Sequence, residues 1–207
     1  MKTLIFSDTH LTTHFDSVKF DFLKDLFRHY DRIIMNGDFW DGYEVTFARF
    51  AKSDWRGLFP YMREKTIYIY GNHDRPEWTT HPELFSRAQY DRYTIQVGKK
   101  ELVIEHGHKI APSFDISYPK ISYILSLFFS SRRFQFGNKL RGWENMQMKK
   151  YAQSHLTSNQ ILVCGHSHIA ENSRKQGYIN TGMIDYGIAT YLSVDGEKMT
   201  LVTQTYG

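Results

Sequence analysis

The sequence predicts an α/β sandwich. Five short apolar runs are rich in β-branched or aromatic residues, which is typical of buried strands. They cover residues 4–6, 33–35, 67–70, 102–104 and 161–164. A helical pattern lies between the first two runs, and strands that alternate with helices indicate this fold class. The chain has 207 residues with 41% hydrophobic and 23% charged residues, so we expect one globular domain over residues 1–207.

The first helix is expected at residues 18–30. Val18, Phe22 and Leu26 repeat at helical spacing, and Asp16 or Ser17 precedes them as a candidate N-cap. Beyond residue 172 the pattern changes to short strand-like runs at 178–180, 191–194 and 201–203, with glycines between them. This spacing predicts an antiparallel meander that completes a second sheet.

A segment of different character interrupts the alternation before the last strand of the five. Ile121, Ile124 and Phe128 share one helical face, so we expect a helical cap inserted at about residues 113–150. Seven basic and two acidic residues lie between Asp115 and Lys150, while the whole chain has a net charge of only +4. Any surface that attracts anions is therefore expected to be local to this segment.

The cysteine count and the length of the apolar stretches predict the cellular compartment. Cys164 is the single cysteine, which excludes an internal disulfide and favours a reducing compartment. The apolar stretch at the N-terminus is too short for a signal peptide, and no apolar run approaches the ~20 residues that span a bilayer. We expect a cytoplasmic protein, with peripheral contact at the inner membrane surface through the cap as a further option.

Polar residues of metal-binding type follow each of the five strand-like runs. In α/β sheets ligands bind beyond the carboxyl ends of the strands, so these side chains are expected to meet. Two carboxylates, an amide and several imidazoles exceed the needs of one ion and indicate two divalent ions that share a carboxylate. Manganese is the expected metal, with iron, zinc and nickel as alternatives, because the donors are oxygen and nitrogen. The set is Asp8, His10, Asp38, Asn72, His73, His106, His166 and His168.

The order of these residues resembles the calcineurin-like metallophosphoesterase superfamily. The matching motifs are Asp8-x-His10, Gly37-Asp38-x-x-Asp41, Gly71-Asn72-His73-Asp74, His106 and Gly165-His166-x-His168. The resemblance implies a four-layer fold, in which helices flank two mixed sheets. It also implies that Asp8, His10 and His168 hold one metal, that Asn72, His106 and His166 hold the other, and that Asp38 bridges them. His73 would protonate the leaving oxygen or stabilise charge, and Asp41 and Asp74 would orient imidazoles.

The cap is the feature that narrows the substrate. Its position and its apolar helix with basic residues after it are similar to the UDP-2,3-diacylglucosamine pyrophosphatases. That resemblance implies an amphiphilic nucleotide-diphosphate or lipid-linked substrate, with Arg132, Arg133 and Arg141 beside its phosphates. This chain departs from that subfamily at His73, where an arginine is usual, so a related pyrophosphatase is the broader expectation.

Two other functions stay open at this point. A soluble phosphodiesterase or nuclease could stack bases on Trp40, Tyr43, Trp55 or Trp78, although the surrounding charge is not basic, which disfavours a nucleic-acid partner. A binding module that kept the fold without catalysis should have lost metal ligands, and every expected ligand is present. The sequence does not indicate the oligomeric state.

Overall fold

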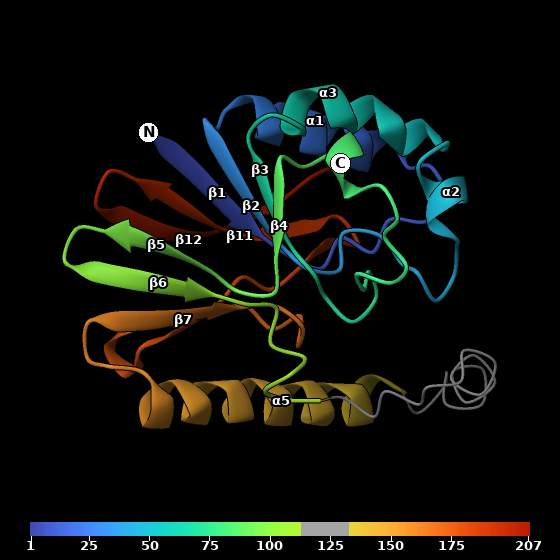
Figure 1. Ribbon diagram of the computed structural model, residues 1–207. Coiled ribbons are helices and arrows are strands. Elements are labelled where there is room, and N and C mark those ends of the chain that lie inside the picture. Colours follow the sequence, from blue (N-terminus) through green and yellow to red (C-terminus); the bar gives the residue numbers. More distant parts are fainter. Residues whose placement is uncertain (113–132) are drawn as a thin grey trace.

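The computed structural model describes residues 1–112 and 133–207, with side chains from residue 139 onward in the second stretch. Its elements form two mixed sheets between layers of helices (Figure 1). The expected four-layer sandwich is therefore confirmed.

The larger sheet has seven strands and contains three of the expected ones, β1 (Lys2–Phe6), β2 (Arg32–Asn36) and β3 (Thr66–Ile69), as parallel neighbours. The short strand β4 (Ala88–Tyr90) extends it beside β3, and the antiparallel β11 (Ile188–Asp195) pairs with β1 on the other side. The strands β10 (Ile184–Asp185) and β12 (Lys198–Thr205) both pair with β11.

The smaller sheet has five strands in the order β5-β6-β7-β9-β8. Their bounds are β5 (Tyr93–Val97), β6 (Lys100–Ile104), β7 (Gln160–Cys164), β9 (Tyr178–Asn180) and β8 (Glu171–Ser173). The strands β6, β7 and β9 are parallel, so the two expected strands of this sheet also end on one side.

The expected meander is wrong in one respect, because its strands join different sheets. The strand β9 pairs with β7, whereas β11 and β12 belong to the larger sheet. The chain crosses between the sheets at Thr181–Ile184. The Thr181 amide donates to the Cys164 carbonyl at the end of β7, and the Ile184 amide donates to the Asp8 carbonyl beyond β1.

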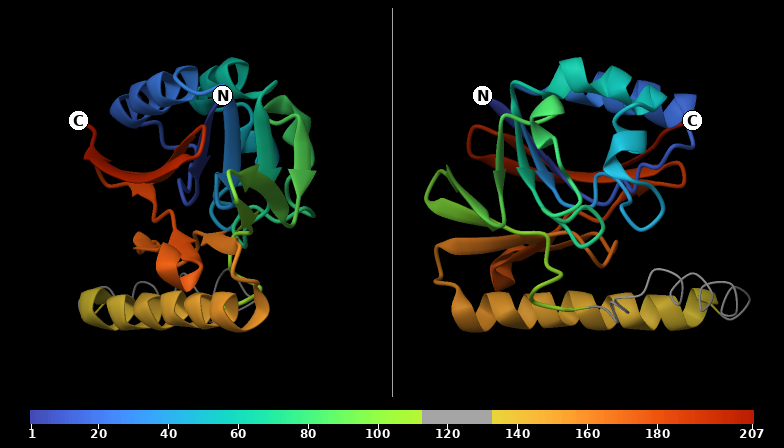
Figure 2. Two further views of the ribbon diagram at one scale, coloured as in Figure 1. Left: turned by 90° about the vertical axis from the view of Figure 1, so that its left-hand side faces the viewer. Right: turned by 45° about the vertical axis from the view of Figure 1, so that its right-hand side comes forward.

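Helices cover the outer faces of both sheets (Figure 2). The first, α1 (Ser17–Arg28), begins as expected, since the Asp16 carboxylate accepts from the amides of Val18 and Lys19. It shares its layer with α2 (Phe47–Phe50), α3 (Phe59–Met62) and the 3-10 turn η1 (Asp54–Leu58). Short 3-10 turns η2 (Pro82–Leu84) and η3 (Arg174–Gln176) lie in loops. The long helix α5 (Arg133–His155) covers the smaller sheet.

Alternation along the strands builds three apolar layers. In β1, Leu4 and Phe6 pack against the α1 layer, while Ile5 packs between the sheets with Ile34 and Ile104. A third cluster, which includes Met148 and Ala152 of α5, packs against Leu162 of β7. Among the described helices, none is both long and apolar enough to cross a bilayer.

Candidate metal centre

The carboxyl ends of parallel strands from both sheets meet at one edge of the sandwich. Asp8 follows β1, Asp38 follows β2, and Asn72 and His73 follow β3. His106 follows β6, and the loop with His166 and His168 follows β7. Backbone hydrogen bonds join these loops, with Thr9 N donating to Asp38 O at 2.9 Å and Gly165 N to His106 O at 3.0 Å. All eight residues expected at strand ends therefore lie in one region.

One cluster consists of Asp8, His10 and His168. The Nε2 atom of His168 lies 3.2 Å from Asp8 Oδ1 and 3.1 Å from His10 Nε2. Two imidazole nitrogens and a carboxylate oxygen thus point at a common position, which suits a divalent ion.

A second cluster consists of Asp38, His106 and His166, whose ligand atoms all lie within 4.8 Å of one another. The His106 Nδ1 donates to the carbonyl of Asn36 at 2.8 Å, which directs Nε2 toward Asp38 Oδ2 at 3.1 Å. The Nε2 of His166 lies 3.0 Å from the Ala111 carbonyl, which directs its Nδ1 inward. Carbonyl groups commonly orient metal-binding imidazoles in this way. Asp38 also lies 3.8 Å from His10, so it stands between the two clusters.

Unpartnered polar atoms provide a test of whether these residues suit metal ions. Among the described residues, Asp8 Oδ1, Asn72 Oδ1 and His106 Nε2 are buried without a hydrogen-bond partner. Buried polar atoms are rarely left in this state, and a bound ion would satisfy all three. The donor set therefore fits divalent metal ions.

The backbone of the centre is strained at the expected ligands. Asp8, His10, Asp38, His166 and His168 all have positive φ angles between 45° and 66°, a region that residues other than glycine seldom adopt. Such strain persists only where surrounding contacts impose it, and it is concentrated at functional sites. Gly37, at φ 83°, approaches the His106 ring so closely that a Cβ atom would lie 2.4 Å from Nδ1.

His73 lies at the mouth of the centre and contacts Asp41. Its Nδ1 is 3.0 Å from Asp41 Oδ2, and its ring packs edge-on against His10 and Tyr43. Burial opposes a charge on this imidazole, but Asp38 and Asp41 outweigh burial and raise the pKa of His73 to about 9. Asp41 therefore orients an imidazole, as the resemblance implied.

Asp74 differs from the expectation that it orients an imidazole. Its Oδ1 accepts from the Gly71 amide and its Oδ2 from the Phe39 amide, both at 2.7 Å. Its carboxylate thus joins the loops after β2 and β3 through the backbone. Burial and the nearby Asp38 charge raise the pKa of Asp74 to about 6. Asp74 is a positioning residue that acts through the backbone of these two loops.

In the metal-free protein, burial and neighbouring charges also shift the pKa values of His166, His106 and Asp8. Burial and repulsion from His106 lower the pKa of His166 to about 4. Burial opposes a charge on His106 as well, but the Asp38 carboxylate reverses this and raises the pKa of His106 to about 10. Burial opposes ionisation of Asp8, yet the facing imidazoles lower its pKa to about 2.

A pocket of about 180 Å³ opens onto the centre, and α5 forms one of its walls. The lining residues from the centre are Asp38, Asn72, His73, His166 and His168, and those from α5 are Leu140, Arg141 and Glu144. Of the expected substrate contacts, Arg141 lines this pocket. Arg133 is the first residue of α5, and Arg132 lies outside the described residues. The expected apolar face at 121–128 also lies outside them.

Sequence reasoning did not predict Leu140 and Glu144 as pocket residues. Their i, i+4 spacing places them on one helix face, but nothing local indicates that this face meets the centre. His108 also lies near, with its ring centroid 5.5 Å from that of His106.

Comparison with known proteins gives a consistent result. The family model of the calcineurin-like phosphoesterase superfamily domain matches residues 1–199. Among solved structures, the chain is similar to Yfce, a phosphoesterase from E. coli, with a TM-score of 0.52 and 15% identity over 100% of both chains. It is also similar to Vps29 from Entamoeba histolytica complexed with Zn²⁺, with a TM-score of 0.50 and 14% identity over 99% of this chain and 92% of that one. At these identities the structures show a shared fold alone. No curated protein matches the chain at a significant level.

Proposed function

Since the chain belongs to the calcineurin-like phosphoesterase superfamily, we propose that it hydrolyses a phosphoester or phosphoanhydride bond with the help of two divalent metal ions. Asp8, His10 and His168 would hold one ion, and Asn72, His106 and His166 the other, with Asp38 between them. When bound, two such ions activate water as a nucleophile and neutralise charge on the phosphate. Manganese is the expected metal.

The observation that carries this proposal is the pair of clusters around Asp38. Each combines a carboxylate with two imidazoles. One ligand atom in each cluster, and Oδ1 of the nearby Asn72, are buried without a hydrogen-bond partner. A structural polar network would satisfy these atoms within the protein. The strained backbone at five of the seven proposed ligands supports the same conclusion.

His73 is the proposed proton donor to the leaving oxygen. Its Nδ1 faces Asp41, so Nε2 is the nitrogen that can donate to a substrate. In the metal-free protein, Asp38 and Asp41 raise the pKa of His73, and Asp41 favours the protonated ring that a general acid requires. Asp41 holds the ring and stabilises its charged form. His73 also belongs to a third cluster with His10 and Asp38, so a role as a metal ligand is the competing assignment that the tests below must exclude.

The substrate that we propose is amphiphilic, such as a nucleotide-diphosphate or lipid-linked phosphate. The pocket of about 180 Å³ has room for a phosphate and the atoms next to it, but it is smaller than usual ligand pockets of ~300–1,000 Å³. The rest of a substrate must therefore extend out along α5. Arg141 lies at this exit and is suited to a second phosphate.

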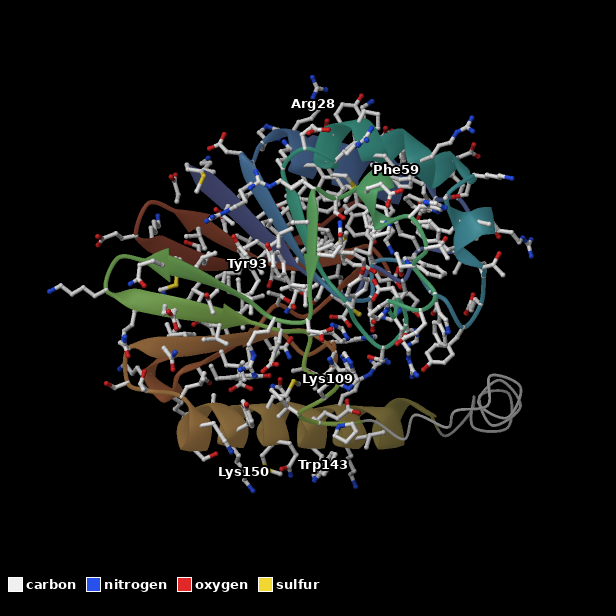
Figure 3. All side chains as sticks on the ribbon, viewed as in Figure 1. Arg28, Phe59, Tyr93, Lys109, Trp143 and Lys150 are labelled. Atoms are coloured by element: carbon white, nitrogen blue, oxygen red, sulfur yellow. The ribbon has the colours of Figure 1, made fainter. Side chains whose placement is uncertain are left out.

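The outer face of α5 supports contact with an anionic lipid surface. Trp143 and Met146 are 44% and 41% exposed, although both are large and apolar. Lys139 and Lys150 flank them at helical spacing, and Trp143 and Lys150 project away from the sheets (Figure 3). Aromatic and basic residues together on one face favour binding at a membrane interface.

Burial of two of the four candidate base-stacking side chains weakens the nuclease alternative. Trp40 and Trp55 are 0% and 2% exposed, so neither can stack on a base. Tyr43 and Trp78 remain available only as half-buried side chains. A soluble phosphodiesterase remains the second candidate, because the chemistry at the metal centre would be the same.

The proposal is tested by hydrolysis assays with added Mn²⁺. The substrates are p-nitrophenyl phosphate, bis-p-nitrophenyl phosphate, a nucleotide-diphosphate-sugar lipid and single-stranded DNA. We expect turnover of the lipid and no cleavage of DNA. Asp38→Ala should abolish metal loading and turnover, whereas the control Asp195→Ala, on an exposed strand end, should retain both. A metal-loaded protein that hydrolyses none of these substrates would favour a binding module.

The membrane contact has its own test in a vesicle sedimentation assay. Wild type should bind vesicles that contain anionic lipids, and Trp143→Ser should reduce binding. Tyr186→Ser removes an aromatic side chain that is 84% exposed next to β11 and is the matched control. Equal binding by wild type and Trp143→Ser would argue for the soluble phosphodiesterase.

A further inference from the structure

A buried polar network joins α5 to the loop that carries His166 and His168. Its centre is Asn145, which is 5% exposed on the inner face of α5. The residue before it, Glu144, lines the pocket of the metal centre. The helix wall of the pocket and this network therefore share one turn of α5.

Asn145 contacts partners on two strands and on the loop. Its Oδ1 lies 2.6 Å from Tyr178 Oη, 3.0 Å from Asn180 Nδ2 and 3.2 Å from Ser167 Oγ. On the other side its Nδ2 donates to the Glu171 carboxylate. Asn180 Nδ2 also lies 2.8 Å from the Gly165 carbonyl, which begins the loop.

An amide is the group that this position requires. If the Asn145 side chain were flipped, its oxygen would face the Glu171 carboxylate and its NH₂ group would face that of Asn180. Aspartate would place a second carboxylate against Glu171, and an aliphatic residue would leave three buried polar groups with one partner fewer. The network therefore selects both the residue type and its orientation.

The loop needs such support because its geometry is unfavourable. His166 and His168 have φ angles of 66° and 60°, and Ser167 between them is fully buried. Left-handed backbone in residues other than glycine persists only when contacts impose it. The contacts include the Asp8 carboxylate on the His166 amide at 3.0 Å and the network around Ser167 Oγ.

We propose that Asn145 is a positioning residue that holds the His166–Ser167–His168 loop in the geometry needed to bind metal. The inference rests on the proposed function, because that function assigns His166 and His168 to different ions. Loss of Asn145 should then weaken binding at both metal sites. Groups that orient metal ligands through a second layer of contacts typically change metal affinity by ~10–100-fold when removed.

A matched control separates this role from simple anchoring of α5. Lys149 lies one turn along the same helix and forms an ion pair with Glu171 of β8, which lies outside the loop. Lys149→Met removes this anchor and keeps the aliphatic stem. Both variants should lower thermal stability, whereas only Asn145→Ala should weaken metal binding.

The test is titration of the metal-free protein with Co²⁺, followed by visible absorption, in five proteins. They are wild type, Asn145→Ala, Lys149→Met, Ser167→Ala and the double variant Asn145→Ala/Ser167→Ala. We expect ~10-fold or greater weakening for Asn145→Ala and ~2-fold or less for Lys149→Met. Because Asn145 and Ser167 contact each other and share Asn180 as a partner, the loss in the double variant should be smaller than the sum of the two single losses.

Three results would overturn the inference. They are wild-type affinity in folded Asn145→Ala, an equal loss in Lys149→Met, and fully additive losses in the double variant. If Asn145→Ala does not fold, Ser167→Ala and a further variant, Asn180→Ala, decide together, since wild-type affinity in both would remove the two links from the network to the loop. If wild type does not bind Co²⁺, the proposed function is refuted. If wild type binds Co²⁺ and turns over substrate, a failed prediction for the variants refutes only the role of Asn145.

Discussion

Replacement of Gly71 by alanine would place a methyl group in the space that Asp38 occupies. A Cβ atom at Gly71 would lie 2.1 Å from Asp38 Oδ1 and 2.6 Å from the Asp38 backbone nitrogen, whereas ordinary contacts begin near 3.4 Å. Either residue 71 or Asp38 must therefore move by more than about 1 Å. A displacement of ~1 Å in a catalytic site can cost ~10²-fold in rate. Overpacking should also reduce the free energy of unfolding by ~1–3 kcal/mol.

The same substitution elsewhere provides the control. Gly142 lies on the exposed side of α5, and a Cβ atom there meets none of the described residues within 4 Å. Gly142→Ala should raise the free energy of unfolding by ~0.5–1 kcal/mol, because alanine favours a helix interior over glycine.

The assay measures bound Mn²⁺ after dialysis, turnover of bis-p-nitrophenyl phosphate and thermal stability. We expect Gly71→Ala to lose metal and at least ~10²-fold in turnover, and Gly142→Ala to retain both. Wild-type metal content and turnover in Gly71→Ala would refute the placement of Asp38 at the centre.

Three further predictions concern single groups of the centre. His73→Ala should lower kcat by ~10²–10⁴-fold for an alkyl leaving group, and less for p-nitrophenolate, which needs no proton; loss of a bound metal would show that His73 is a ligand. Asp74→Ala should reduce the free energy of unfolding by ~2–4 kcal/mol in urea melts, because two buried amides lose their acceptor; an unchanged midpoint would contradict this. The raised pKa of His106, about 10 against 6.5 unfolded, stabilises the metal-free protein fully below pH 6.5, and this contribution disappears as pH rises through 10. The His106 proton competes with metal, so the affinity for Mn²⁺ should rise between pH 6.5 and 10. Calorimetric titrations that give the same affinity at each pH would contradict this prediction.

The site was more predictable from the sequence than the topology was. Each expected ligand follows a short apolar run, and parallel strands place their ends together, so Asp8, Asp38 and His106 could be assigned to one region. The sheet to which the runs at 178–180 and 191–194 belong depends on long-range pairing, and no local pattern encodes it. The strand β5 was missed because Tyr93, Ile95 and Val97 alternate with polar residues, whereas the expected strands were continuous apolar runs.

Contacts that act through the backbone or across layers could not be predicted from the sequence either. Asp74 stands next to His73 in the chain, yet its carboxylate faces two amides. Asn145 sits in a helix that the expected cap includes, and its partners come from strands and loops later in the chain. Their roles depend on tertiary distances, which residue types and spacing do not encode.

The central claim is that two metal ions share Asp38. Anomalous X-ray scattering from crystals grown with saturating Mn²⁺ tests it most directly. We predict two peaks ~3–4 Å apart, one beside Asp8, His10 and His168 and the other beside Asn72, His106 and His166, with Asp38 contacting both. A single ordered peak, or a second ion bound by His73 without Asp38, would contradict the account.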